Sequence, residues 1–430
     1  MMSEGAATIS KSVNQHYLDK VMDLAEERDV AATEDIFNAT GTKLIAKGTK
    51  ISRSVQEKLI LHKLHRPLES CIAVAGGIDM QAITAEARRI AQEIEPVGHL
   101  LNAVGGAGPS PFDIQADAQF GSAMSMMLTI TQRGGPAAFT HCVLVSLVSI
   151  CLARKLGLDQ KQQISVALAG LLHDIGELYI LPEYLDPKRR LLPHEWKHVV
   201  VHPRVGQMLI SELENCPPEV ALAVAEHHER FDGAGYPRQT AGQGISVLGQ
   251  ILATAEMVSG AFMKQHKPLE RAELAMKIMP GEHAHDLVSI ISSVARVTRS
   301  GSPPPSEAPY DEMHQRLKIL FDRIIGILHT AQTLVDMQTI RSTKAKDLVS
   351  WVLERVNIIQ RAFSSTGLDV CLLEDAIHDI GISFEVEAAA IEIQVRLREV
   401  ARDLFLRASA FASHEMQAFQ PLIVLLDEAG

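Results

Sequence analysis

The sequence of 430 residues lacks the features that would place a protein in or beyond a membrane. No uninterrupted apolar run approaches about eighteen residues, so we predict no membrane span. The opening segment MMSEGAATISKSVNQ has no basic cluster followed by an apolar run, so no secretory signal is expected. The five cysteines, at 71, 142, 151, 216 and 371, are odd in number and show no Cys-x-x-Cys spacing. This pattern favours reduced thiols acting as small apolar residues, and we expect a cytoplasmic protein.

The chain also lacks an excess of basic residues. It has 41 Lys and Arg against 52 Asp and Glu, a net charge of −11. Proteins that bind nucleic-acid polymers usually carry a basic excess on the binding face, so this class is disfavoured. A local basic pocket for a small phosphate ligand remains compatible with the composition. The 47% of hydrophobic residues indicates folded cores and makes disorder over most of the length unlikely.

Composition shifts along the chain predict two or three domains, because 430 residues exceed the usual size of a single core. The segment from 30 to 75 has short β-type runs broken by Gly and then one amphipathic helix. Residues 114–298 show apolar residues at helical spacing nearly throughout. The predicted divisions are a small α/β module over 1–78, a helix and linker over 79–113, a helical domain over 114–298, a Pro-rich linker over 299–312 and a helical domain over 313–430.

The two predicted linkers rest on their local composition. GGAGPSPFD at 105–113 is rich in Gly, Pro and Ser, and 299–312 contains three consecutive prolines, which cannot lie inside a helix. Beyond the second linker, long amphipathic segments indicate a bundle or a dimerisation element. The expected fold class is mainly all-α, with a small α/β module at the N-terminal side.

Residue types that ligate metals gather in the predicted helical domain. Imidazole is the commonest protein ligand of metals, and a carboxylate can bridge two cations. These residues lie in predicted helices or at their ends, so helices of one bundle can aim them into a shared interior. The candidate metal ligands are His141, His173, Asp174, His202, His227, His228 and Glu256.

Some of these histidines also have a purely structural interpretation. A single histidine on an apolar helix, such as His141, is more often a core residue than a ligand. The pair His227-His228 is harder to explain in this way, because burying two imidazoles is costly. Two further histidines, His194 and His198, stand at helical spacing from His202. We include only His202, which is predicted to end a helix before Pro203, whereas the other two flank charged residues on an exposed face.

The tetrapeptide His-Asp-Ile-Gly occurs twice, at 173–176 and at 378–381. The other candidate ligands accompany the first copy. The second is followed only by His414 and has no histidine doublet nearby. One His-Asp pair cannot fill a coordination sphere, so we predict that this copy closes a helix before Gly381.

Three motifs resemble the HD-GYP family, a branch of the HD phosphohydrolase superfamily: HDIG at 173–176, His-Pro-x-x-Gly at 202–206 and HHERFDGAGYP at 227–237. The resemblance covers about residues 114–298. It implies an all-α domain that holds two or three metal ions, commonly iron or manganese, and hydrolyses cyclic di-GMP to pGpG or GMP.

The resemblance also implies roles for individual residues. His141, His173, Asp174 and Glu256 would hold one metal ion. Asp174 would bridge it to a second ion held by His202, His227 and His228. The residues that would shape the lip over the substrate are Gly235, Tyr236 and Pro237.

The residue after the first HDIG motif departs from the family pattern. Members usually carry lysine there, and this chain has Glu177. The exchange replaces a cation that would contact the scissile phosphate by an anion, which would repel the substrate unless Glu177 binds metal. We therefore treat Glu177, together with Asp174, as a candidate catalytic residue.

Further departures lie nearby. Glu256 stands where the superfamily has aspartate, and its side chain is one methylene longer. The stretch after it leaves Lys264 and Lys267 as the nearby cations and candidate substrate-binding residues. Ala137 occupies the position of a third-metal carboxylate, so we expect two metal ions.

Two functions from different classes follow. The first is a metal-dependent phosphodiesterase that acts on cyclic di-GMP or a related cyclic dinucleotide. The alternative is a catalytically degenerate domain that binds nucleotide or serves as a signalling module. In either case, the C-terminal helices are candidates for forming a homodimer or binding a signalling partner.

Overall fold

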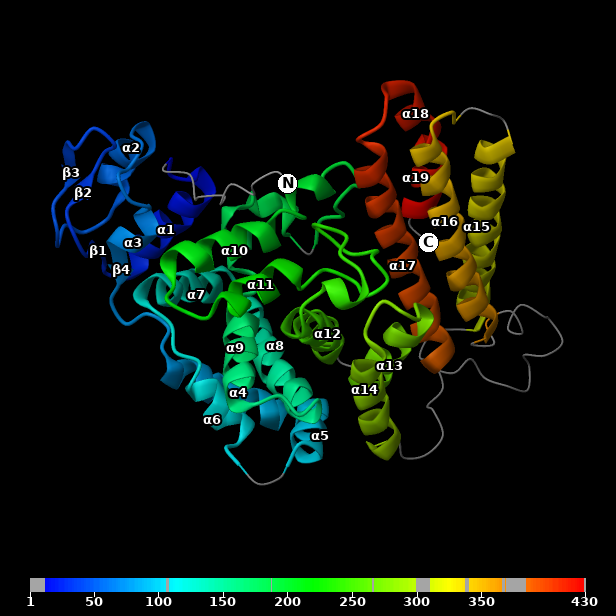
Figure 1. Cartoon of the computed structure of the whole chain (residues 1–430), viewed down its shortest axis with the longest axis horizontal. Coiled ribbons are helices and arrows are strands. Elements are labelled where there is room, and N and C mark those ends of the chain that lie inside the picture. Colours follow the sequence, from blue (N-terminus) through cyan, green and yellow to red (C-terminus); the bar gives the residue numbers. More distant parts are fainter. Residues whose placement is uncertain are drawn as a thin grey trace. The chain divides into compact units, whose positions relative to one another are not determined.

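The computed structural model describes residues 12–105, 108–186, 188–264, 267–298, 310–336, 340–365, 368 and 384–428. Helices account for most of these residues and the strands are short, which confirms the mainly helical fold class (Figure 1). The chain divides into two compact units. The first comprises residues 1–189, 198–269 and 283–294, and the second comprises 190–197, 270–282 and 295–430. The boundaries predicted at 78, 113, 298 and 312 remain predictions.

The N-terminal part of the first unit is a small α/β arrangement. Helix α1 (Gln15–Glu27) begins after Asn14, whose side chain accepts a hydrogen bond from the Tyr17 amide. Strand β1 (Val30–Ala32) pairs antiparallel with β4 (Ile72–Val74), and β2 (Ile36–Phe37) pairs antiparallel with β3 (Lys43–Ile45). Between these strands lie α2 (Arg53–Leu61) and the short α3 (Leu68–Cys71).

Part of the predicted linker at 105–113 is helical, which corrects that prediction. After α4 (Met80–Glu93) and α5 (Glu95–Ala103), helix α6 (Pro111–Ala116) begins inside this segment. The Ser110 side chain accepts a hydrogen bond from the Asp113 amide, and the Asp113 carboxylate accepts one from the Ser110 amide. Pro111 fits the first turn because no helical partner exists for an amide there. The same Ser and Pro that suggested a linker thus start a helix.

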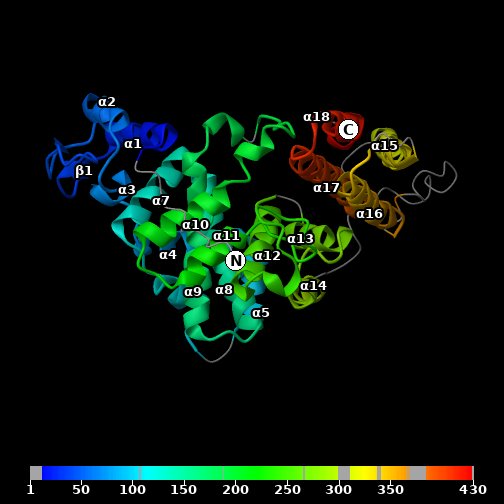
Figure 2. The same cartoon turned by 45° about the horizontal axis from the view of Figure 1, so that its top comes forward.

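The central bundle of the first unit carries the candidate ligands. Its helices pack as neighbours, with α8 against α9 and α12, and α11 against α9, α10 and α12 (Figures 1 and 2). They are α7 (Ser122–Gly134), α8 (Pro136–Lys155), α9 (Gln160–Leu172), α10 (His202–Leu213), α11 (Pro218–Glu226) and α12 (Val247–Phe262).

Helix α8 is the most apolar element of this bundle. Among the described helices it alone is long and apolar enough to cross a membrane, yet 72% of its most apolar window is buried inside the protein. Burial of this kind is typical of a core helix, and α8 begins at Pro136 and ends with Arg154 and Lys155 in its last turn.

Short helices connect α9 to α10 and α11 to α12. They are η1 (Ile175–Tyr179), η2 (Pro182–Tyr184), η3 (Trp196–His198) and η4 (Gly242–Gly244). The prediction that a helix ends at His202 is wrong, because α10 begins there. Pro203 lies in the first turn, where its missing amide costs no hydrogen bond. His202 still faces inward, but from the start of a helix.

The second unit contains long helices packed side by side. Helix α16 (Thr343–Ser365) packs against α15 (Tyr310–Asp336) and α17 (Phe384–Ala408). Helices α18 (Ser413–Ala418) and α19 (Gln420–Asp427) follow α17, and most of α13 (Pro268–Ile278) also belongs to this unit, whereas most of α14 (His285–Thr298) belongs to the first unit. Helix α15 starts inside the predicted 299–312 linker, whose residues 299–309 lie outside the described residues. The second HDIG copy at 378–381 also lies outside them.

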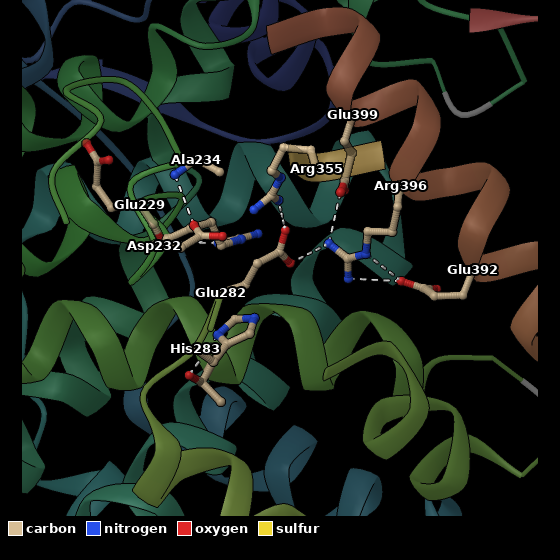
Figure 3. A network of polar contacts seen from close by, with 11 residues as sticks. Glu229, Asp232, Ala234, Glu282, His283, Arg355, Glu392, Arg396 and Glu399 are labelled. Carbon is tan, nitrogen blue, oxygen red and sulfur yellow. Dashed lines mark hydrogen bonds and ion pairs between the residues drawn. The ribbon is translucent and has the colours of Figure 1, made fainter. Parts of the chain in front are cut away.

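A buried ionic network holds the second unit together. The carboxylate of Glu282, 4% exposed, accepts hydrogen bonds from Arg355 on α16 and from Arg396 on α17, the latter at 2.9 Å (Figure 3). Arg396 also donates to Glu392 at 3.0 Å and to Glu399 at 2.8 Å. Because a buried charge is costly without a partner, this network ties α16, α17 and the segment before α14 to one another.

Candidate metal centre

The seven candidate metal ligands come together in two adjoining groups in the first unit. Within each group the candidate ligand atoms lie within 4.8 Å of one another. One group contains His141, His173 and Glu256, and the other contains Asp174, His202, His227 and His228.

Helix ends supply most of these side chains. His173 caps the C-terminus of α9, His227 caps α11, and His202 is the first residue of α10. His141 and Glu256 project from within α8 and α12. Because these helices pack against one another, their ends and inner faces converge on one interior volume.

Asp174 lies between the two groups and turns one oxygen toward each. Its Oδ2 is 2.9 Å from Nε2 of His173. Its Oδ1 is 3.5 Å from Nε2 of His202 and 3.6 Å from Nε2 of His227. A carboxylate placed in this way can bridge two cations.

The first group brings nitrogen and oxygen donors close together without satisfying them all. Oε2 of Glu256 lies 2.8 Å from Nε2 of His141 and 3.2 Å from Nε2 of His173. Nε2 of His173 is fully buried and makes no hydrogen bond within the described structure, despite its short distances to Asp174 and Glu256. His141 and Glu256 hydrogen-bond to each other, whereas the buried Nε2 of His173 is left available for a cation.

The second group also contains imidazole nitrogens whose lone pairs are available to a cation, as the hydrogen bonds of its histidines indicate. Nδ1 of His202 lies 2.8 Å from the carbonyl oxygen of Val199, and Nδ1 of His227 lies 2.7 Å from that of Val224. Donation by both Nδ1 atoms leaves a lone pair on each Nε2, and these two atoms are only 3.1 Å apart. A cation that accepts both lone pairs removes their repulsion, so this donor set fits a divalent metal ion.

The electrostatics of the second group match the protonation states that metal ligation needs. Burial, reinforced by His227, lowers the pKa of His202 to about 4. Burial and His227 likewise hold the pKa of His228 well below its usual range. Burial opposes ionisation of Asp174, but His173, His227 and His202 together outweigh it and keep the pKa of Asp174 well below its usual value. Neutral imidazoles and an ionised carboxylate are the ligating forms.

In the first group the carboxylate is ionised and the histidines hold protons more tightly. Burial opposes the charge on Glu256, yet His141 holds its pKa well below the usual value. Burial also disfavours charged His141 and His173, but Glu256 and Asp174 respectively raise their pKa values. Metal binding here must release protons, so we expect it to weaken as the pH falls.

Glu177 lies on η1, three residues after Asp174, and belongs to neither group of candidate ligands. Burial, with Asp174 next in effect, raises the pKa of Glu177 well above its usual value. The raised pKa favours the neutral carboxyl, so the predicted repulsion of phosphate by an anion is weakened. Lys20 approaches this segment from α1 and donates to the backbone oxygens of Glu177 at 3.2 Å and Leu178 at 2.9 Å. No sequence signal pointed to Lys20, because the contact spans a large separation along the chain.

The loop after the histidine doublet is held tightly. A Cβ atom on Gly235 would lie 2.4 Å from the carbonyl oxygen of His228, so only glycine fits there. The Tyr236 ring stacks on the His228 ring with centroids 4.6 Å apart, and Pro237 follows in a cis peptide bond. The loop thus lies against a candidate ligand, and the contact of residues 235–237 with substrate remains a prediction.

Sequence reasoning missed Glu229 as a structural support of this loop. Its carboxylate is 1% exposed and accepts hydrogen bonds from the amides of Arg238 at 2.7 Å and Thr240 at 3.0 Å. The only sequence signal was that Glu229 directly follows the histidine doublet; in the structure Glu229 is as buried as His227. Glu229 thus ties residues 238–240, at the far end of the loop, to the chain directly after the histidine doublet.

The predicted substrate cations lie beyond the end of α12. Lys264 is exposed, and Lys267 adopts a φ of 41°. Their role remains a prediction. Arg230, which the sequence analysis did not select, acts electrostatically on both His228 and Tyr236. His194 and His198 are exposed and lie outside both ligand groups, as expected, with His198 stacked on Tyr184 at 4.9 Å.

Comparison with known proteins identifies this bundle. A family model described as HD domain matches residues 124–286. The chain is 32% identical over 128 residues to 3'3'-cGAMP-specific phosphodiesterase 3 of Vibrio cholerae. This match covers 30% of this chain and 28% of that protein. It is 34% identical over 125 residues to the cyclic di-GMP phosphodiesterase response regulator RpfG of Xanthomonas campestris. That match covers 29% of this chain and 32% of that protein.

A third relative is a cyclic di-GMP phosphodiesterase of Thermotoga maritima, 32% identical over 151 residues. This match covers 33% of the chain and 40% of that protein. The chain therefore spans well under half the length of each of these relatives. The match assigns an HD domain to residues 124–286, and with these relatives it confirms the HD-GYP resemblance seen in the sequence in a divergent form.

Proposed function

We propose that the HD domain hydrolyses a phosphodiester bond of a cyclic dinucleotide with the help of two divalent metal ions. The observation that carries this proposal is the position of Asp174, with one oxygen toward His173 and the other toward His202 and His227. Asp174 and the histidines around it would help to hold two divalent ions, which would supply charge stabilisation for the attacking and leaving oxygens when a phosphodiester bond is hydrolysed.

The substrate class follows from the relatives. They are named as phosphodiesterases of cyclic di-GMP or of 3'3'-cGAMP. Cyclic di-GMP is the first candidate substrate, with pGpG or GMP as product. A related cyclic dinucleotide is the second candidate.

Iron or manganese is the proposed metal. All seven candidate ligands are imidazoles or carboxylates, the donors that suit these ions. Cys142, next to His141, does not compete as a ligand, because burial raises the pKa of its thiol to about 12 and keeps it protonated. The donor set thus gives no advantage to a metal that prefers thiolate.

The remaining residues position substrate. The Tyr236 ring, held against His228, offers a flat apolar surface at the edge of the centre. Glu229 fixes the loop that carries Tyr236 through two backbone amides. Glu177, which favours its neutral form, would tolerate a phosphate close to Asp174 better than an ionised carboxylate would.

Hydrolysis by purified protein tests this function. Protein loaded with manganese, or with ferrous iron under anaerobic conditions, should convert cyclic di-GMP or 3'3'-cGAMP to linear products that chromatography resolves. Asp174→Asn should abolish turnover, while His198→Asn, which alters an exposed histidine outside both groups, should leave it unchanged. Metal bound at both groups without product from either nucleotide would instead support the degenerate binding module.

The role of the C-terminal helices in association and the cytoplasmic location of the protein remain predictions. The second unit leaves Ile319, Ile325 and Val424 between 42 and 60% exposed. We propose that these helices form a homodimer or bind a signalling partner. The oligomeric state of the full chain in solution, measured by light scattering, decides between the two.

A further inference from the structure

A cavity of about 320 Å³ lies in the first unit, beside the segment that follows Asp174. Its walls come from the residues before α1, from α3, from the end of η1 and from α10. Its size falls at the lower end of the range for small-molecule sites. Most of its lining is apolar and includes Val13, Leu68, Val205, Met208 and Leu209.

One wall of this cavity is polar and buried. Glu69 is only 5% exposed, and its carboxylate accepts a hydrogen bond from the Tyr179 hydroxyl; both residues line the cavity. Tyr17 stacks on Tyr179 with ring centroids 5.1 Å apart, and the electrostatic effect of Glu69 extends to it. The Tyr17 hydroxyl is buried and has no hydrogen-bond partner among the described residues. Tyr17 itself does not line the cavity, so the polar groups within reach of a ligand include those of Glu69 and Tyr179 but not the Tyr17 hydroxyl.

Two walls of the cavity continue into the metal centre. Tyr179 ends η1, which starts directly after Asp174, and α10 begins with His202. Helix α1 and the residue before it hold η1 through three hydrogen bonds to the backbone of η1. Lys20 donates two of them, and the Asn14 side chain donates the third to the Tyr179 carbonyl at 3.4 Å. A molecule in this cavity would therefore contact Tyr179 at the end of η1 and residues of α10, the two elements that follow Asp174 and begin with His202.

We propose that this cavity binds a small, mainly apolar molecule with a hydrogen-bond-donating head group, and that its occupation stabilises the packing of α1 on η1. The apolar walls accept the body of the ligand. Burial raises the pKa of Glu69, so its carboxyl can accept a hydrogen bond from an ammonium or a hydroxyl head group, and it offers an anionic head group no favourable partner. Binding itself does not depend on the proposed phosphodiesterase activity, whereas any effect on catalysis does.

The test uses the full chain, without metal or substrate, labelled with ¹³C at its methionine methyl groups. Met208 is assigned from the Met208→Leu variant. Titration with hexylamine and with 1-hexanol should shift the Met208 signal saturably at millimolar concentration, as expected for ligands of this size. Hexanoate, which carries an anionic head, should not. Absence of a saturable shift with both donors, or stronger binding of hexanoate, would overturn the proposal.

Matched variants locate the site. Val13→Trp places a bulky ring into the cavity from a segment outside the helices and should abolish the Met208 shift. Leu61→Trp, at a 69% exposed position of α2 that does not line the cavity, should leave the shift unchanged. Equal binding by both variants would place the probes elsewhere and contradict the proposal. Circular dichroism confirms that each variant is folded before titration.

The head group and the coupling to η1 are tested separately. Glu69→Gln keeps an acceptor for the Tyr179 hydroxyl but removes the charge, so hexylamine binding should weaken more than 1-hexanol binding. Amide exchange over residues 175–180 should slow when the wild-type cavity is filled and should not respond in Val13→Trp. Unchanged exchange in the liganded wild type would refute the coupling. None of these readouts requires turnover, so a failure here is distinct from a failure of the proposed activity.

Discussion

The backbones of Gly176 and His202 pass so closely that a Cβ atom on Gly176 would lie 2.1 Å from the His202 carbonyl oxygen. The same atom would lie 2.9 Å from the amide nitrogen of Gly206. The glycine of the HDIG motif therefore contacts the His-Pro-x-x-Gly motif directly. This contact holds Asp174, two residues before Gly176, beside the first turn of α10.

Gly176→Ala should separate these two motifs. The new methyl group meets backbone atoms that cannot rotate away, so we expect the free energy of unfolding to fall by about 1–3 kcal/mol. Metal affinity should fall as well, because Asp174 and His202 move apart. Gly260→Ala on α12 is the matched control, since no atom lies within 4 Å of its Cβ, and it should leave metal binding intact. Denaturant unfolding and metal titration measure both effects, and equal behaviour of the two variants would contradict the account.

Glu177→Lys should strengthen substrate binding without changing the metal content. The lysine places a cation near Asp174, where a substrate phosphate is expected, and Glu177 is outside both ligand groups. We expect the KM for cyclic di-GMP to fall roughly tenfold, equivalent to about 1.4 kcal/mol. Glu177→Gln, which removes the ionisable carboxyl without adding a cation, is the control and should change KM less. Loss of a metal ion from the lysine variant would instead show that Glu177 is a ligand.

Glu282→Ala should strongly destabilise the second unit. It leaves Arg355 and Arg396 buried without their shared carboxylate, a change that typically costs about 3–5 kcal/mol. Glu399→Ala removes a 43% exposed partner of the same Arg396 and should cost no more than about 1 kcal/mol. Urea unfolding of the two variants provides the comparison, and similar losses would mean that the buried network contributes little.

The stability of the second unit should depend on pH through Asp403 on α17. Burial raises the pKa of Asp403 from 3.8 to about 8, with Glu399 adding to the effect and Arg407 opposing it. Since the folded state holds the proton more tightly than the unfolded chain, this contribution is complete below about pH 3.8 and is lost as the pH rises through about 8. Asp403→Asn should remove this part of the pH dependence. Relative to wild type, the variant should become more stable as the pH rises over that window, and a constant difference would argue against a raised pKa.

The sequence identified the candidate ligands because their information is local and redundant. Two adjacent histidines, an HDIG motif and a histidine before proline can be found without knowing the fold, and a helical bundle brings such residues together. The structure places all seven in two groups. The starts and ends of individual helices were harder to predict. Pro203 and Pro111 suggested the end of a helix and a linker, and both lie in first turns, because proline is compatible with either context.

Long-range contacts could not be predicted from the sequence at all. Lys20 meets the backbone after Asp174 from α1, and the Tyr17–Tyr179 stack joins the same two segments. The weakened charge of Glu177 is also a property of the folded environment, since burial raises its pKa. The single-residue departure at 177 suggested repulsion, whereas its burial favours a neutral group.

The most direct test of the proposed two-metal hydrolysis is the rate of cyclic di-GMP hydrolysis as metal is added stepwise to metal-free protein. Two metal sites linked by Asp174 predict that the rate rises until two equivalents per chain are bound and then levels off, and that Asp174→Asn gives no product at any metal content. Full activity with a single equivalent, or no linear product with two equivalents bound, would contradict the account.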